Sequence, residues 1–330
     1  MNDFLAGILN GINAVVHNHG WSIVVFTILI KLVLFPLDFK SRKSMRKMQV
    51  IQPEVAKLQK KYANDKEKLN QKTSELYRKY KVNPLSGCVP MLLTMPILFA
   101  MFAAMRSIAN TQLANQVIDL ITTGTQTNEG WLWVKNLWMP DSPFASLIAD
   151  QGSLGQITPE IWRSVFATLS VDKIEALANL GEGLAITVEN ITSETIFAAL
   201  SQSKPYLEGL APWAVMPEIN LIFTRLNIFA NPNGLLILPI VAAGSQFITT
   251  MLQPQAAPQA EGQGAGANKM MKYFFPLFSL FICVTSNAGF ALYWVATNLI
   301  AGAQGYALNK YFEAQEKKTS NTTIGEGSIK

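Results

Sequence analysis

Long runs of apolar residues that contain no charged side chain constrain the fold of this chain more than any other feature. One run, over residues 21–37, is interrupted only by Lys31, and four others occupy residues 89–105, 234–251, 273–285 and 289–304. A helix needs roughly 20 predominantly apolar residues to cross a bilayer. Hydrophobic residues make up 49% of the chain and charged residues 15%, which also favours a membrane protein. We therefore expect an all-α integral membrane protein whose five transmembrane helices occupy residues 21–38, 84–106, 233–252, 272–286 and 288–305.

The last two runs leave an alternative open. Each is short for a span, and residues 286–289 (Ser-Asn-Ala-Gly) between them fit a tight turn. One re-entrant pair is therefore as simple an interpretation as two spans, although we prefer two spans.

The start of the chain predicts an interfacial segment. It lacks the basic and short apolar regions of a secretory signal peptide, so we expect the mature protein to begin at Met1, without a large N-terminal domain. Residues 3–16 place their apolar side chains on one helical face. Residues 1–20 are therefore expected to form an amphipathic helix that lies in the membrane interface.

The distribution of charge predicts the orientation of the spans. Residues 39–82 contain fourteen Lys and Arg against four Asp and Glu, and short basic loops stay in the cytoplasm. Residues 107–232 have twelve acids against five basic residues, the opposite sign. The N-terminus is then outside, and the loop 253–271 and the tail 306–330 lie in the cytoplasm.

The basic loop over residues 39–83 is expected to form a cytoplasmic helical hairpin. Two apolar stripes indicate two helices, and Asn64 is predicted to cap the second, with Glu67 completing a capping box. Lys57, Lys60 and Lys61 are candidates for docking a ribosome or a client chain. The alternative is a solvated face next to anionic lipid.

The long acidic loop contains a segment that predicts a separate helical domain. Within residues 142–225, helix starts are predicted at Thr158 and Ser170 and a helix stop at Gly181. We expect this domain to be hinged off the membrane core.

Lys31 is the residue whose position most demands a functional explanation. An ammonium within a span costs about 2.5–3.5 kcal/mol on insertion scales. The other four spans contain no acid, and Asp38 lies seven residues away. Lys31 therefore either extends to the headgroups or faces a water-filled cavity. The candidate polar residues that would line such a cavity are Thr27, Thr94, Ser245, Gln246 and Asn298. Each of them could instead form a hydrogen bond to a neighbouring helix.

Several motifs resemble the YidC/Oxa insertase family. Residues 31–37 (Lys-Leu-Val-Leu-Phe-Pro-Leu) close the first span, residues 45–54 open the hairpin, and residues 83–90 (Asn-Pro-Leu-Ser-Gly-Cys-Val-Pro) open the second span. Leu238-Pro239 and residues 291–298 (Ala-Leu-Tyr-Trp-Val-Ala-Thr-Asn) follow in the family's order. The resemblance covers about residues 15–107 and 230–312, and residues 142–225 fall outside it.

The resemblance implies a function and a site. Members enclose a hydrophilic groove, open to the cytoplasm and to lipid, through which the polar tail of a client crosses. Lys31 matches the basic residue of the groove, which is usually an arginine. A lysine can lose its proton in a poorly solvated site, whereas an arginine stays charged. Thr27, Thr94 and Trp294 match positions that line the groove or meet the client.

We therefore expect an insertase and chaperone of a bacterial inner membrane, acting alone or with the Sec translocon. Nascent membrane proteins, the ribosome and membrane lipids are the expected partners.

Two other classes of function fit the sequence less well. A small-solute transporter or channel would suit a charged cavity, but the chain has no internal repeat and no acid within the hydrocarbon for proton coupling, since Asp38 lies at the membrane edge. A membrane enzyme is not expected, because the two histidines, His17 and His19, lie before the first span. We expect no catalytic residue, cofactor, metal or small-molecule substrate.

Overall fold

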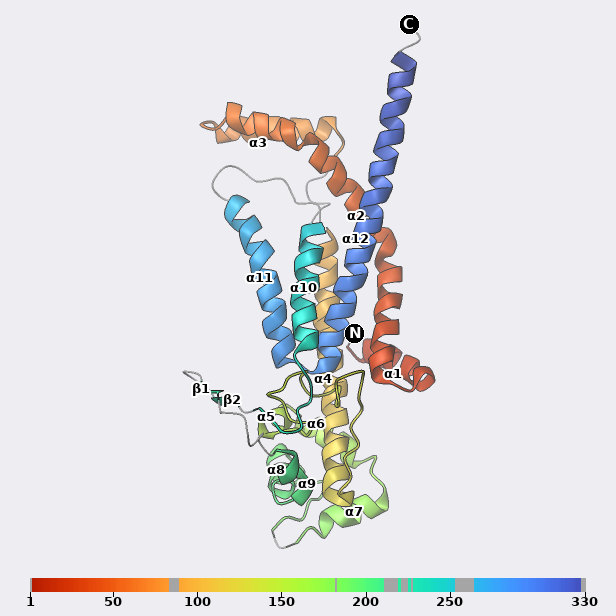
Figure 1. The fold of residues 1–330 in the computed structure, drawn as a ribbon, viewed down its shortest axis with the longest axis vertical. Coiled ribbons are helices and arrows are strands. Elements are labelled where there is room, and N and C mark those ends of the chain that lie inside the picture. Colours follow the sequence, from red (N-terminus) through yellow and green to blue (C-terminus); the bar gives the residue numbers. More distant parts are fainter. Residues whose placement is uncertain are drawn as a thin grey trace. The chain divides into compact units, whose positions relative to one another are not determined.

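The computed structural model describes residues 2–82, 89–181, 183–210, 219–220, 225–226, 228–252 and 264–327, and Figure 1 shows the order of their elements. The chain divides into two compact units. The first unit comprises residues 1–26, 100–242 and 280–294, and the second comprises residues 27–99, 243–279 and 295–330. Several long helices begin in one unit and end in the other.

Each apolar run of the sequence overlaps a helix. Two stretches, His19–Lys61 and Met95–Thr123, are long and apolar enough to cross a membrane, and Phe4–Val16, Ile237–Leu252 and Lys272–Thr285 are shorter apolar helices. The fold is therefore predominantly helical, as predicted, whereas the count of five spans stays a prediction. The helices that carry the runs are α2 (His19–Lys61), α4 (Val89–Thr123), α10 (Ile237–Leu252), α11 (Gly264–Thr285) and α12 (Ala288–Gly327).

Helix α10 begins later than the predicted span start at residue 233, because the side chain of Asp141 organises the residues before it. The Asp141 carboxylate accepts hydrogen bonds from the backbone N–H of Leu235 (2.8 Å) and Leu238 (2.7 Å). Leu236 between them has a φ of +63°, which is outside the right-handed helical region. A carboxylate at a helix N-terminus satisfies free N–H groups and favours the helix dipole. Asp141 therefore fixes where α10 starts.

Helices α11 and α12 are joined by the tight turn that the sequence predicts. Only Ser286 and Asn287 separate them, and the Asn287 side chain accepts a hydrogen bond of 2.9 Å from the backbone N–H of Phe290. Helix α11 has 22 residues, of which Lys272–Thr285 form the apolar part. The choice between two spans and a re-entrant pair stays open.

The basic hairpin has a different start from the predicted one. Its first helix is not separate, because α2 continues without a break to Lys61 and includes Pro36 and Pro53. Helix α3 (Lys66–Lys79) follows, and Asp65, not Asn64, caps it by accepting a hydrogen bond of 3.0 Å from the backbone N–H of Lys68. The predicted cap at Asn64 is wrong by one residue, since Asp65 offers a carboxylate at the position facing the free N–H groups.

The two arms of the hairpin meet through one polar contact and a small apolar cluster. The Tyr80 hydroxyl donates a hydrogen bond of 2.7 Å to the Glu54 carboxylate. Ile51, Val55 and Val82 are buried, whereas α3 itself contains no buried residue.

Short helices and one small ribbon occupy the predicted insertion, all within the first unit. The helices are α5 (Gln151–Leu154), α6 (Pro159–Phe166), α7 (Val171–Ala178), α8 (Ser193–Leu200) and α9 (Lys204–Gly209). The strands β1 (Ile219–Asn220) and β2 (Arg225–Leu226) pair antiparallel, with Ile219 opposite Leu226. The predicted helix starts are confirmed, since Thr158 and Ser170 are the N-cap residues of α6 and α7, and α7 ends before Gly181.

The insertion packs against the end of α4 within the first unit, and its predicted hinge to the membrane core stays a prediction. The Lys173 ammonium on α7 lies 2.5 Å from a carboxylate oxygen of Asp119 on α4. The Asn110 side chain, also on α4, donates a hydrogen bond of 3.0 Å to the backbone carbonyl of Gln156. Trp162 is fully buried in the same unit. Residues far apart in sequence thus supply the insertion with a shared core, a feature that turn signals alone do not reveal.

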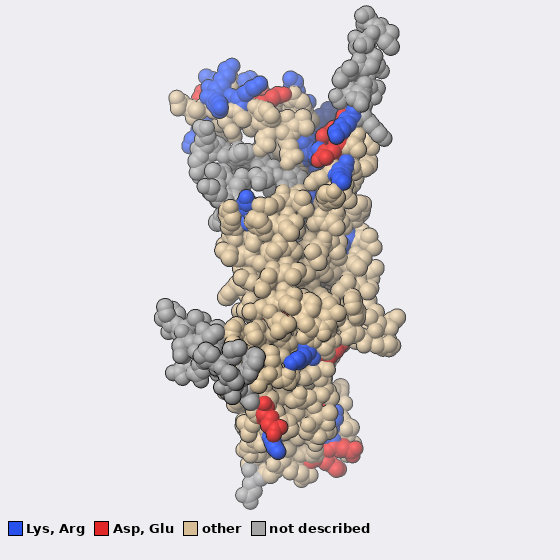
Figure 2. Space-filling model, viewed as in Figure 1, with Lys and Arg blue, Asp and Glu red and all other residues tan. Residues whose placement is uncertain are grey.

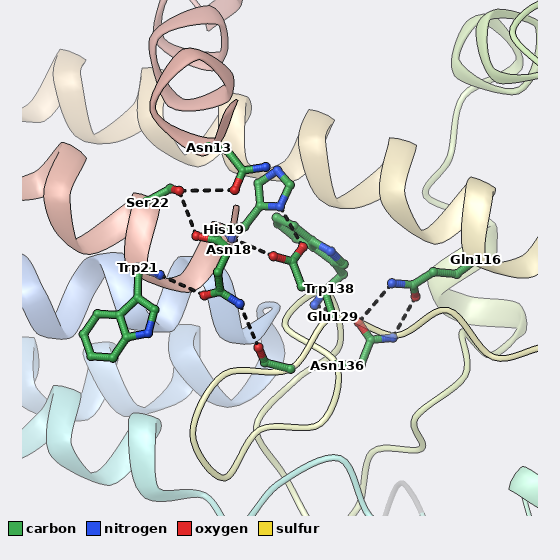
Figure 3. A network of polar contacts seen from close by, with 10 residues as sticks. Asn13, Asn18, His19, Trp21, Ser22, Gln116, Glu129, Asn136 and Trp138 are labelled. Carbon is green, nitrogen blue, oxygen red and sulfur yellow. Dashed lines mark hydrogen bonds and ion pairs between the residues drawn. The ribbon is translucent and has the colours of Figure 1, made fainter. Parts of the chain in front are cut away.

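A second polar network in the first unit holds the junction between α1 (Asn2–Val16) and α2 (Figure 3). The ring Nδ1 and the backbone N of His19 each lie 2.6 Å from a carboxylate oxygen of Glu129. His19 is 7% exposed, and its ring contacts Trp138 edge-on at 5.0 Å between centroids. Burial alone would raise the pKa of the Glu129 carboxyl, but the hydrogen bonds from the His19 ring and backbone outweigh burial and lower it.

We predict that Glu129→Gln lowers the stability of the folded protein by about 1–3 kcal/mol near pH 7, the cost of losing hydrogen bonds to a charged group. Because the folded-state pKa lies below the ordinary value of 4.5, the carboxylate stabilises the fold at higher pH. This stabilisation disappears as the pH falls through the lowered value. The apparent unfolding temperature in detergent, measured from pH 7 down to pH 3, should therefore differ between the two proteins at pH 7 and converge in acid.

The matched control is Glu189→Gln, which removes an exposed acid from the same unit. It should leave the unfolding temperature unchanged. A gap between Glu129→Gln and the parent protein that is the same at every pH would contradict this account of the His19–Glu129 contact.

Candidate functional site: the polar faces of α2, α10 and α12

In the second unit, Lys31 lies on the side of α2 that faces protein. Thr27, one helical turn earlier on the same face, is only 1% exposed. Leu32 and Val33, on the other side of the helix, are 60% and 74% exposed. Lys31 itself is partly buried. The exposed apolar side chains suit a lipid-facing surface, and the lysine is turned away from it.

Two further charged residues share the face of Lys31. Asp38 and Arg42 follow it by seven and eleven residues, and both intervals return to the same side of an α-helix. Asp38 attracts both cations electrostatically. Among the described residues, it forms a salt bridge within 4.0 Å with neither of them. The face therefore carries two cations with one acid between them.

Polar side chains also join α10 to α12 within the second unit. The Thr249 hydroxyl donates a hydrogen bond of 3.1 Å to the backbone carbonyl of Asn298, and Gly302 lies against the same hydroxyl. Three residues further along α10, the carbonyl of Leu252 accepts a hydrogen bond of 3.2 Å from the Asn309 side chain of α12. Ser245 is buried on α10. Intervals of four, three and four residues place Asn298, Gly302, Gly305 and Asn309 on one side of α12.

Two buried polar atoms on α12 have no hydrogen-bond partner in the part of the chain that the structure describes. The Asn298 Nδ2 and the Thr297 Oγ1 are both buried, and neither has a hydrogen-bond partner among the described residues. An unsatisfied buried polar group costs about 1–3 kcal/mol, so it normally marks a place for water or a ligand. These atoms make α12 suited to bind a hydrated or polar group.

The structure places five of the predicted groove residues in the second unit. Thr27, Ser245 and Asn298 are buried, whereas Lys31 and Gln246 are partly buried, and the Gln246 amide lies 3.5 Å from the Thr250 hydroxyl on its own helix. Trp294 belongs to the first unit, where its ring contacts Phe290 at 5.7 Å between centroids. The side chain of Thr94 lies outside the described residues. One shared groove therefore stays a prediction.

Sequence reasoning did not assign Asp38 and Arg42 to the site. In the sequence, Asp38 stands out only as a distant partner for Lys31, and Arg42 is one of the fourteen basic residues of the loop. The spacing of Lys31, Asp38 and Arg42 on one helix was the available signal. It could be used only if α2 continued past the expected span end at residue 38, as it does.

The predicted docking lysines of the hairpin are accessible. Lys57, Lys60 and Lys61 are exposed near the end of α2, and Figure 2 shows Lys and Arg gathered on the hairpin. The Lys61 ammonium lies 5.5 Å from the centre of the Tyr62 ring. A surface hollow in this unit runs along α3, not beside Lys31; its lining residues are Asn70, Thr73, Ser74, Tyr77, Arg78, Lys81 and Val82.

The chain is similar to several known proteins that are described as membrane protein insertase YidC. The Fusobacterium nucleatum protein is 54% identical over 107 residues, which is 32% of this chain and 52% of that protein. The Leptospira interrogans protein is 29% identical over 302 residues, 91% of this chain and 32% of that protein. The Clostridium perfringens protein is 42% identical over 127 residues, 38% of this chain and 47% of that protein. This chain thus spans about half or less of each relative.

The family comparison covers most of the chain. The family model described as 60Kd inner membrane protein matches residues 11–317. This range covers most of both units and includes the basic hairpin and every apolar run. The chain therefore belongs to the 60Kd inner membrane protein family of bacterial inner membrane proteins, which is the YidC/Oxa family that its motifs predict.

Proposed function

We propose that this protein is a membrane protein insertase and chaperone. The observation that carries the proposal is Lys31, a partly buried cation that sits beside buried Thr27 and away from the exposed apolar side of α2. Family membership and the names of the relatives agree with this function. The function does not require a reactive group, only a surface that lowers the cost of moving a polar segment through hydrocarbon.

The proposed mechanism follows from the cost of burying polar groups. A polar client tail that enters hydrocarbon loses its hydration, at several kcal/mol for each unsatisfied group. Five spans that enclose a wet groove, lined by Thr27, Lys31, Thr94, Ser245, Gln246, Trp294 and Asn298, would replace part of that hydration. The charge of Lys31 would add attraction for acidic tails. The apolar segment of the client would then leave sideways into lipid.

The proposed orientation puts the hairpin and the C-terminal tail in the cytoplasm and the N-terminus outside. Basic residues near span ends stay on the cytoplasmic side. The exposed Lys57, Lys60 and Lys61 would then face the ribosome or the nascent client, with the Sec translocon as a further partner. Anionic lipid would contact the remaining basic residues near the membrane.

A small-solute transporter or channel is the competing function. A single charged cavity suits an anion, but no acid lies among the predicted spans beyond the first to couple transport to protons. The two functions separate experimentally. A transporter would move a labelled anion in reconstituted vesicles and leave client insertion unaided.

We predict that single cysteines placed at Lys60 and Lys310 are labelled by an impermeant maleimide only from the cytoplasmic side, and one at Glu189 only from outside. All three positions are exposed, so lack of labelling from one side would report topology and not burial. The native Cys88 and Cys283 are first replaced by serine or alanine. Labelling of position 310 from outside would refute the five-span topology.

We also predict a ranked effect of Lys31 substitutions in reconstituted proteoliposomes, scored by protease protection of single-span clients that differ only in tail charge. Lys31→Arg should retain activity, because the charge is kept. Lys31→Leu should reduce insertion of the acidic-tailed client most and that of the neutral-tailed client less. Lys31→Glu should be worse than Lys31→Leu for the acidic tail, since it adds repulsion.

Val33→Leu is the matched control, because it changes the exposed apolar side of the same helix. It should insert every client as the parent does. If all Lys31 variants fold and insert every client equally well, the lysine only extends to the headgroups. If the parent protein transports a labelled anion but does not insert clients, the transporter function is favoured.

A further inference from the structure

Arg42, in the second unit, is seated directly on the backbone of α12. A Cβ atom built on Gly305 would lie 3.0 Å from one terminal nitrogen of the Arg42 guanidinium and 3.1 Å from the other. The close approach therefore depends on the absence of a side chain at Gly305. The guanidinium lies against α12 with its NH1 nitrogen buried, and Arg42 as a whole is partly buried.

One nitrogen of this guanidinium is buried without a partner. Arg42 NH1 has no hydrogen-bond acceptor among the described residues. A guanidinium presents five N–H donors in a flat fork that matches a carboxylate or phosphate. An unmet donor of this kind has a strong preference for an anion.

The next arginine on α2, Arg46, differs from Arg42 because its guanidinium is bound by carboxylates of α12. Arg46 forms two hydrogen bonds of 3.0 Å to the carboxylate of Glu316 on α12, and a third nitrogen lies 3.8 Å from Glu313. Its charge is already neutralised by the protein. Arg42, one turn earlier, forms no salt bridge with any described residue and is attracted through space by Asp38.

The position of Arg42 connects it to the proposed groove. It lies eleven residues beyond Lys31 on the same face of α2, which is about 16 Å along the axis at 1.5 Å per residue. Its seat, Gly305, shares the side of α12 that carries Asn298 with its free amide. A chain that approaches Lys31 from the cytoplasmic end of α2 would pass Arg42 first.

We propose that Arg42 is a second anion-binding residue, which captures the carboxylates of an acidic client tail before they reach Lys31. Asp38, between the two cations, limits how tightly a tail is held at either, so that the tail can advance. This inference rests on the proposed insertase function. It assigns tail selectivity to the entrance of the path as well as to its centre.

A client carboxylate fits Arg42 better than a lipid phosphate does. Lys40, Lys43 and Lys47 are exposed on the other sides of α2 and can meet headgroups directly. Arg42 is instead covered by α12, where a lipid with two acyl chains has less access than an extended polypeptide. Lys43 is therefore a suitable control, because it is a neighbouring cation that is exposed.

The test compares Arg42→Gln and Lys43→Gln in the reconstituted insertion assay, with three clients that carry acidic, neutral or basic tails. We expect Arg42→Gln to reduce insertion of the acidic-tailed client several-fold and to leave the neutral-tailed client unchanged. Lys43→Gln should affect neither. Arg42→Glu should lower insertion of the acidic tail further and raise that of the basic tail, a reversal that a purely structural role cannot produce.

Three results would overturn the proposal. Equal losses for all three tails would assign Arg42 to packing, and normal insertion of the acidic tail by Arg42→Gln would remove it from the path. A loss that appears only in vesicles with anionic lipid, and not in zwitterionic vesicles, would identify lipid phosphate as the ligand. Insertion of the neutral tail by the parent protein shows independently that the insertase function holds, so failure of one proposal is distinct from failure of the other.

Discussion

The cost of placing a lysine inside an apolar helix is the constraint on which the second unit depends. Moving a charged lysine side chain into the hydrocarbon costs roughly 2.5–3.5 kcal/mol of free energy on insertion scales, so Lys31 is not expected to face lipid without compensation. The compensation is visible in how α2 is turned, with Thr27 buried beside the lysine and Leu32 and Val33 exposed on the other side. Asp38 adds attraction from the same face without closing an ion pair that would cancel the charge. The cation is thus retained and remains available.

Helices α10 and α12 of the second unit use small and polar residues at their contacts. Gly302 and Gly305 bring the backbone of α12 close to Thr249 and to Arg42, respectively. Close backbone approach and hydroxyl or amide contacts are the usual means of joining helices in a membrane, where apolar side chains gain little from leaving lipid. The same choice leaves the Asn298 amide and the Thr297 hydroxyl without partners among the described residues. The side of α12 that packs closely against its neighbours is therefore also the side that carries polar groups.

The first unit uses buried polar side chains to fix helix ends. Asp141 is buried and fixes the start of α10 with two backbone hydrogen bonds, and Glu129 binds His19 at the start of α2. The buried amide of Asn136 bonds Gln116 and the carbonyl of Leu147. These contacts are internal to the unit. Buried donors without a partner among the described residues occur in both units, at the Trp131 and Trp138 ring nitrogens in the first and at Arg42 and Asn298 in the second.

The sequence predicts those features that depend on local pattern. Apolar runs predict the helices, and Thr158 and Ser170 predict helix starts because capping is decided within a few residues. The delayed start of α10, the shift of the α3 cap to Asp65 and the docking of Lys173 on Asp119 depend on contacts or competition that a single stretch of sequence does not contain. Arg42 was missed for a related reason, since its significance comes from Gly305, more than 260 residues away. The five-span count and the orientation still rest on length and charge.

The central claim is that the faces carrying Gln246 and Thr297 are wet and bind client, whereas the exposed side of α2 faces lipid. Single cysteines at Gln246, Thr297 and Val33, in a protein without Cys88 and Cys283, can be tested with a charged maleimide added from the cytoplasmic side. The account predicts reaction at positions 246 and 297, protection of both by a stalled client, and no reaction at position 33, although Val33 is 74% exposed. Reaction at position 33 alone, or reaction at positions 246 and 297 that a client leaves unchanged, would contradict it.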